Sequence, residues 1–252
     1  ATASVAPAPA PPISGTSALE PAMFPATETA APAGTQADGR SAVATLHPLL
    51  VAAIEPHSPV AEQYRTVRAR ISHHEETTPL RTLLVTSPGD GDGKSITAAN
   101  LALTMAQEFQ RRVVLVDADF RGPTVHSLFG LSLEPGLAEL LSGEATIDDV
   151  AIYLPDYRLT VIPAGRAPHF PAELLGSTAM RRAIDALRGR FDRVLFDVPA
   201  AMPLADAGTL APMADGVLMV VRAGVTQRPA LEDALAVFDD EKVVGVVLND
   251  AQ

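Results

Sequence analysis

The sequence contains no cysteine, which excludes disulfide bonds, thiolate metal sites and cysteine nucleophiles. Cationic residues are also scarce, since 19 Lys and Arg stand against 30 Asp and Glu and give a formal net charge of −11. A nucleic-acid-binding protein is expected to present a basic face, and this charge argues against one. No apolar run reaches the roughly 18 residues of a membrane-spanning helix, and the N-terminus lacks the layout of a signal peptide. These absences predict a soluble protein and are compatible with a reducing cytoplasm.

The first 45 residues differ in composition from the rest of the chain. They are rich in Ala, Pro, Thr and Ser and contain few large apolar side chains. Such a segment cannot bury enough apolar surface to offset the entropy lost on ordering. We therefore expect a disordered tail over residues 1–45 and a folded domain over residues 46–252.

Short apolar runs alternate with helical patterns in the remainder of the chain. Near-continuous apolar runs, rather than alternating ones, are typical of strands that are buried on both faces. Alternation of such strands with helices predicts an α/β fold, with a mostly parallel, doubly wound sheet and helices on both faces. The predicted strands are 82–87, 112–117, 159–164, 192–197, 216–221 and 242–249, and the predicted helices include 95–110, 178–189 and 228–239.

The glycine-rich stretch SPGDGDGKS, residues 87–95, follows the first predicted core strand and precedes a predicted helix. Ligands of doubly wound sheets bind beyond the carboxyl ends of the strands. Glycines let successive backbone N–H groups point at an anion there, and the helix start adds its positive dipole end. Lys94 is expected to reach the β- and γ-phosphates of a nucleotide, and the Ser95 hydroxyl to ligate Mg²⁺.

This stretch departs from the strict pattern G-x-x-x-x-G-K-[ST], because Pro88 stands where the first Gly belongs. The strand before it and the helix after it still favour a phosphate-binding loop of a deviant Walker A type over an ordinary surface turn. The residues expected to contact the nucleotide here are Gly89, Asp90, Gly91, Asp92, Gly93, Lys94, Ser95 and Ile96.

Acidic residues end two further predicted strands. Asp117 and Asp119 follow the run VVLV, and Asp197 ends the run RVLFD. Any one of them alone is more typical of a turn or of a helix N-cap. Because all three follow strands beside a phosphate-binding loop, they predict a site for Mg²⁺ and for positioning a nucleophile.

The motif D-x-D-x-R followed by P-T, which reads DADFRGPT here, resembles the Walker A′ element of bacterial tyrosine kinases, the P-loop kinases of capsule and exopolysaccharide assembly. The resemblance covers roughly residues 55–250. It implies a P-loop NTPase fold and an ATP- and Mg²⁺-dependent protein-tyrosine kinase that regulates capsular or extracellular polysaccharide biosynthesis or export. Other stretches that resemble the family are SPVAEQYRTVRARI, GLAELLSGE, VIPAGRAPHFPAELLGSTAMRRAIDALRGRFDRVLFDVPA, LADAGTLAPMADGVLMVVRAGVT and GVVLND.

The resemblance also implies roles for single residues. Asp117 would orient the tyrosine hydroxyl or act as its base, together with Lys94 and Asp119 as the catalytic set. Ser95, Asp119 and Asp197 would hold the metal. Asn249 resembles the adenine-reading Asn of related ATPases.

The same resemblance has consequences for assembly. Glu62, Arg65 and Arg68 match an E-x-x-R-x-x-R motif that pairs neighbouring subunits of the family in a ring, whereas without the family a solvated helical face is the simpler interpretation. The chain has only three tyrosines and no C-terminal tyrosine cluster, so the expected acceptor is a tyrosine of another protein. A membrane-embedded polysaccharide chain-length or activator protein would hold the kinase at the inner face of the cell membrane.

Two alternative functions share this fold and site. A partitioning-type switch ATPase would carry a signature lysine five residues before Lys94, where this chain has Gly89. A non-catalytic, nucleotide-gated scaffold of a polysaccharide export complex is consistent with the missing tyrosine cluster. The presence of Asp117, Asp119 and Asp197 together argues against the scaffold, because a protein that only binds nucleotide can dispense with the base.

Overall fold

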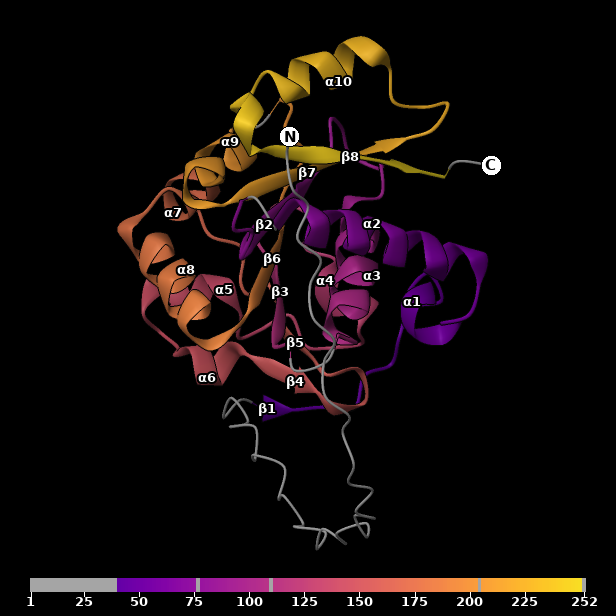
Figure 1. Ribbon diagram of the computed structural model, residues 1–252. Coiled ribbons are helices and arrows are strands. Elements are labelled where there is room, and N and C mark those ends of the chain that lie inside the picture. The colour runs from indigo at the N-terminus through magenta and orange to yellow at the C-terminus, as the bar shows by residue number, and fades with distance from the viewer. Residues whose placement is uncertain (1–39, 76–77, 109–110, 204, 251–252) are drawn as a thin grey trace, which may run out of the picture. The chain divides into compact units, whose positions relative to one another are not determined.

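The structure is a computed structural model that describes residues 40–75, 78–108, 111–203 and 205–250 (Figure 1). Its strands form one eight-stranded sheet in the order β1-β4-β5-β3-β6-β2-β7-β8. Neighbouring strands are parallel except for β4 and β5, which are antiparallel. The strand bounds are β1 Arg40–Ser41, β2 Thr82–Thr86, β3 Val113–Asp117, β4 Ile152–Leu154, β5 Leu159–Ile162, β6 Arg193–Asp197, β7 Gly216–Arg222 and β8 Val243–Asn249.

Helices cover both faces of this sheet (Figure 1). Three short 3₁₀ turns, at Pro155–Tyr157, Ala211–Met213 and Asp240–Lys242, complete the described secondary structure. The prediction of a mostly parallel, doubly wound α/β sheet is confirmed. The helix bounds are α1 Val51–Ile54, α2 Pro59–Glu75, α3 Lys94–Ala106, α4 Val125–Leu128, α5 Leu137–Ser142, α6 Ile147–Val150, α7 Pro171–Leu175, α8 Thr178–Arg190, α9 Asp206–Leu210 and α10 Arg228–Leu235.

The core consists of two apolar clusters, one on each face of the sheet. Alternate residues of a strand point to opposite faces, and β2 follows this rule because Leu84 packs in one cluster while Leu83 and Val85 pack in the other. The first cluster takes in α5, α7, α8 and α9, and the second takes in α1, α3 and α4. Burial on both faces is the reason the strands read as continuous apolar runs in the sequence.

Helix α8 shows how local sequence produces one of these elements. Its buried residues Met180, Ala183, Ile184 and Leu187 recur at the spacing of one helical face. Ser177 caps the helix, because its hydroxyl oxygen accepts a hydrogen bond from the Met180 N–H at 3.1 Å. The predicted helix over 178–189 therefore agrees closely with the observed bounds.

Regular secondary structure is described from residue 40, before the predicted boundary at residue 46. Arg40–Ser41 forms β1, which pairs in parallel with β4, and the Ala42 N–H donates to the Tyr153 carbonyl at 3.1 Å. Residues 1–39, which make up most of the predicted tail, lie outside the described residues. Amino-acid composition does not indicate this pairing, because it involves the backbone of only two residues.

Among the described residues, no helix is both long enough and apolar enough to cross a bilayer.

We expect Phe196→Ala to lower the free energy of unfolding by about 3–5 kcal/mol, because Phe196 is fully buried in β6 and its loss leaves a cavity. The measurement is urea denaturation, with Val225→Ala as the control. Val225 is 60% exposed, so that change is expected to stay within about 0.5 kcal/mol of the wild type. If Phe196→Ala lowered the free energy of unfolding as little as Val225→Ala does, the burial of Phe196 in the core would be contradicted.

Candidate active site

The carboxyl ends of β2, β3 and β6 meet at one edge of the sheet. These three strands are neighbours, and their register places Asp197 directly beside Asp117 on one side and Val85 on the other. The loop after β2 is the glycine-rich stretch, and it leads into α3 at Lys94. The fold thus brings the predicted phosphate-binding loop and the predicted acidic residues together.

Two glycines of this loop have backbone conformations that favour glycine. Gly91 and Gly93 have φ angles of +84° and +93°, in the left-handed region. A Cβ atom on Gly93 would lie 2.1 Å from Nδ2 of Asn249. Asn249, predicted as an adenine-reading residue, therefore packs directly on the loop.

Asp92 anchors the loop from within. Its carboxylate accepts the Gly89 N–H at 3.1 Å and the Thr226 hydroxyl at 2.7 Å, and its backbone carbonyl accepts from Asn249 Nδ2 at 2.9 Å. Asp92 is only 5% exposed. Sequence analysis placed Asp92 among the nucleotide contacts, but the geometry gives its side chain a structural role, joining the loop to the segment after β7.

Lys94 lies at the start of α3 and pairs with an acidic residue from the next strand end. Its Nζ atom is 3.0 Å from Oδ2 of Asp119. Burial alone lowers the pKa of Lys94, but the carboxylates of Asp197 and Asp119 outweigh it and raise the pKa above its ordinary value. Lys94 is therefore held as a cation against the acidic cluster.

Asp117 is fully buried, and backbone N–H groups fix its carboxylate. Oδ1 accepts from Asp119 at 3.0 Å, and Oδ2 accepts from Thr124 at 3.1 Å and from Val125 at 3.0 Å. Burial, with the nearby charge of Asp197, holds the pKa of Asp117 well above its usual range. A raised pKa makes the carboxylate more basic, which suits a general base.

Asp119 connects the acidic cluster to the segment that follows β3. Its Oδ1 atom accepts from the backbone N–H groups of Arg121 at 3.2 Å and Gly122 at 3.0 Å, while Oδ2 faces Lys94. The carboxylate is thereby oriented with one oxygen toward the phosphate-binding loop.

Asp197 is fully buried, and neither of its carboxylate oxygens has a hydrogen-bond partner within the described part of the chain. Burial raises its pKa to about 7, although Lys94 and the neighbouring Ser95 hydroxyl, which lies outside good hydrogen-bond geometry, oppose this effect. A buried carboxylate without a partner is costly unless a cation or a donor satisfies it.

The carboxylate of Asp197, which lacks a hydrogen-bond partner among the described residues, is a candidate ligand for Mg²⁺. In P-loop proteins Mg²⁺ is bound by one or two carboxylates, a hydroxyl, water and the phosphates of the substrate. Asp197, Asp119 and the Ser95 hydroxyl offer that donor set beside the loop. No group of three His, Cys, Asp or Glu side chains able to hold a metal occurs among the described residues, so the assignment of these ligands stays a prediction.

The structure adds a residue that sequence analysis missed. Asp206, at the start of α9, accepts from Arg121, with Nε–Oδ2 at 2.7 Å and Nη2–Oδ1 at 3.4 Å. The Asp206 side chain is 1% exposed. Asp206 lies in LADAG, one of the stretches that resemble the family. The residues around it do not indicate that its partner is Arg121, which lies 85 residues away in the chain.

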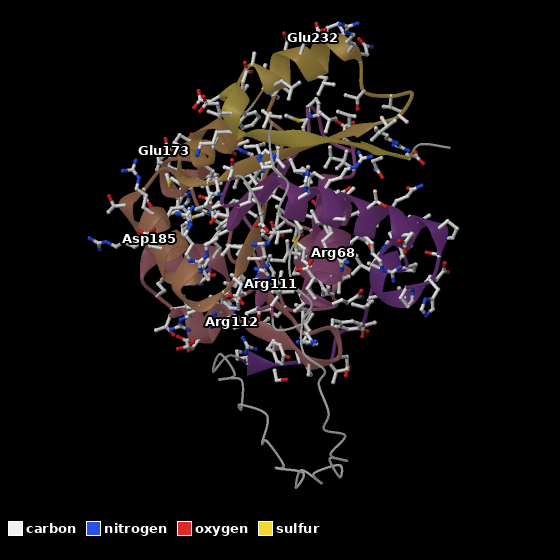
Figure 2. The ribbon with its side chains drawn as sticks, in the orientation of Figure 1. Arg68, Arg111, Arg112, Glu173, Asp185 and Glu232 are labelled. Atoms are coloured by element: carbon white, nitrogen blue, oxygen red, sulfur yellow. The ribbon has the colours of Figure 1, made fainter. Side chains whose placement is uncertain are left out.

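The residues of the E-x-x-R-x-x-R motif lie on α2 and form contacts within the chain. Glu62 pairs with Arg65 at 2.6 Å. Arg68 donates to the Thr104 carbonyl at 2.8 Å and lies 3.3 Å from Glu108, which ties α2 to α3 (Figure 2). Pairing of subunits through this motif stays a prediction.

This chain is similar in sequence and fold to known P-loop proteins. The ParA family profile, described as an NUBPL iron-transfer P-loop NTPase, matches residues 80–146. The tyrosine-protein kinase YwqD of Bacillus subtilis is 36% identical over 203 residues, which cover 79% of this chain and 85% of that protein. The kinase domain of the Escherichia coli tyrosine kinase ETK is similar in structure, with a TM-score of 0.75 at 25% identity, covering 81% of this chain and 82% of that chain.

Longer relatives match the same region. The succinoglycan biosynthesis transport protein ExoP of Rhizobium meliloti is 35% identical over 199 residues, which cover 77% of this chain but 25% of that protein. This chain therefore spans about a quarter of the length of such relatives, whereas it spans most of YwqD.

The raised pKa of Asp197 predicts a pH dependence of stability. A carboxyl group with a higher pKa in the folded state adds stability below its unfolded value, about 4, and loses it as the pH rises through about 7. In Mg²⁺-free and nucleotide-free buffer, the free energy of unfolding of the wild type should therefore fall over this range by a few kcal/mol more than that of Asp197→Asn. Urea denaturation at a series of pH values measures the difference, and parallel curves for the two proteins would contradict it.

Proposed function

This chain belongs to the bacterial tyrosine-protein kinases, and on that premise we propose that it transfers the γ-phosphoryl group of ATP to the hydroxyl of a tyrosine in an acceptor protein. The observation that carries the proposal is the contact of Lys94, at the end of the phosphate-binding loop, with the acidic cluster of Asp117, Asp119 and Asp197. Lys94 and these carboxylates together would supply a cation for phosphate, a buried base and metal ligands, of which Asp197 has no hydrogen-bond partner among the described residues.

The transfer proposed here is an in-line displacement at the γ-phosphorus. The backbone N–H groups of the loop and the Lys94 ammonium group stabilise the negative charge that spreads over the γ-phosphoryl oxygens. Lys94 pairs with Asp119 in this structure. The phosphate oxygens of a bound nucleotide would compete with Asp119 for the same ammonium group. Asp90 and Gly91 lie exposed at the tip of the loop, and the nucleotide is proposed to bind along Gly89–Ile96 with its base near Asn249.

Asp117 is the proposed base. Its backbone hydrogen bonds fix its position, and its raised pKa favours uptake of the proton that the tyrosine hydroxyl releases as its oxygen attacks phosphorus. Ser95, Asp119 and Asp197 are the residues that would hold Mg²⁺. The ion, when bound, neutralises charge on the phosphate oxygens.

The proposed cellular role follows from the names of the relatives. ExoP is named a succinoglycan biosynthesis transport protein, and we extend that role here to the control of capsular or extracellular polysaccharide biosynthesis. In this proposal the kinase acts at the inner face of the membrane, recruited by a membrane-embedded partner, and assembles as a homo-oligomer through Glu62, Arg65 and Arg68.

Phosphate transfer to tyrosine tests the proposed function. With Mg²⁺, γ-labelled ATP and a tyrosine-bearing acceptor, the wild type should label tyrosine. Lys94→Met should lower the rate by at least about a hundredfold, because it removes charge stabilisation from the transition state. Asp117→Asn should retain nucleotide binding and lose transfer.

The chain offers a matched control, since Lys94 and Lys242 are its two lysines. Lys242 donates to the Ala214 carbonyl near the amino end of β7, away from the loop. Lys242→Met should therefore transfer phosphate at the rate of the wild type. Label released only as free phosphate by the wild type, or full transfer by Lys94→Met, would overturn the proposal.

A further inference from the structure

A groove with a volume of about 570 Å³ lies at the same edge of the sheet as the catalytic carboxylates. Its walls come from α5, from the loop that follows β5, and from α7 with the residue that caps α8. The side chains that matter for its chemistry are Glu139, Glu144, Arg166, Phe170, Glu173 and Leu174.

The first wall of the groove that bears on the active site is the loop after β5. β5 is the neighbour of β3, so the loop after β5 emerges beside Asp117. Helix α7 packs on α9, whose first residue, Asp206, holds Arg121. The hydrogen bond from Asp206 contributes most to the raised pKa of Arg121, and the carboxylate of Glu173 on α7 adds to it. Glu173 therefore belongs both to the groove and to the surroundings of the catalytic segment.

The wall formed by the loop after β5 is held in shape by a buried carboxylate. Glu139, which is 6% exposed, accepts the Gly136 N–H at 2.7 Å and the Arg166 N–H at 3.0 Å. Gly165 has a φ of +82°, and a Cβ atom there would lie 2.1 Å from Oε2 of Glu139. Backbone fixed in this way presents a preorganised surface, which lowers the entropic cost of binding a ligand.

The exposed chemistry of the groove is aromatic and acidic. Phe170 is 70% exposed at its rim, whereas large apolar side chains are usually buried. Glu144 is exposed and forms no ion pair within the part of the chain that the structure describes. The one arginine, Arg166, already lies 3.5 Å from Glu134 and 3.9 Å from Glu139. The net charge of the groove is therefore negative, which disfavours a phosphate or a nucleotide as its occupant.

We propose that this groove binds the tyrosine-bearing segment of the acceptor protein, with an apolar side chain of that segment against Phe170 and a basic side chain near Glu144 and Glu173. The proposal rests on the kinase function proposed above and names the chemistry of its substrate. Because the loop after β5 follows the strand next to β3, a segment that enters the groove can extend its tyrosine toward Asp117. The charge complementarity selects acceptors with Lys or Arg close to the tyrosine.

The test uses synthetic peptides that carry one tyrosine and a single arginine at successive positions on either side of it. Steady-state kinetics gives KM and kcat for each peptide. Fluorescence anisotropy of labelled Tyr→Phe peptides, with the enzyme loaded with a non-hydrolysable ATP analogue, gives Kd without any transfer. The variants are Glu144→Gln and Phe170→Ala, and the matched control is Glu232→Gln on α10, well away from α7 and Glu173 (Figure 2).

The wild type should prefer arginine at one side of the tyrosine. Glu144→Gln should remove about a twofold to fivefold preference, as expected for an exposed ion pair, and Phe170→Ala should raise Kd and KM for all peptides by roughly tenfold. The value of kcat and the affinity for the ATP analogue should not change, and Glu232→Gln should behave as the wild type.

Equal KM and Kd values for the wild type and both groove variants would overturn the proposal even if tyrosine is phosphorylated. Peptide binding that depends on Glu144 and Phe170, but without phosphate transfer by the wild type, would support the groove and contradict the kinase function. The two failures are thus distinguishable.

Discussion

Three carboxylates lie together at the ends of two adjacent strands, and the ammonium group of Lys94 is the cation that faces them. Asp117 and Asp197 are fully buried and directly paired in register, and Asp119 contacts Lys94 at 3.0 Å. Burial of several acids costs free energy that one cation offsets only in part. The pKa values of Asp117 and Asp197 are raised because burial disfavours their charged forms. A site in this state is electrostatically suited to a divalent cation.

The rest of the domain maintains this arrangement. The order of β3, β6 and β2 in the sheet brings the acids and the loop to one edge, and two apolar layers fix the register of those strands. Asp92 and Asn249 hold the loop against the end of β8, and Asp206 holds Arg121 beside Asp119. The catalytic geometry is therefore set by buried polar contacts between segments, which are strongest where water is excluded.

Much of this structure can be predicted from the sequence, because the patterns that indicate it involve residues close together in the chain. Continuous apolar runs identify the central strands, and the glycine loop with Lys94 and Ser95 identifies the phosphate site. The contacts that complete the site join single polar residues far apart in the chain. Asp92 and Thr226 are 134 residues apart, and Arg121 and Asp206 are 85 apart. The pairing of Arg40–Ser41 with β4 likewise depends on backbone geometry that composition does not encode.

We propose that the Asp197 carboxylate, which has no hydrogen-bond partner among the described residues, is a ligand of the metal that accompanies the nucleotide. Calorimetric titration of a non-hydrolysable ATP analogue into the wild type and Asp197→Asn, with and without Mg²⁺, tests this role. We expect Mg²⁺ to tighten binding to the wild type by about tenfold or more and to have little effect on Asp197→Asn. Equal tightening by Mg²⁺ in both proteins would contradict it.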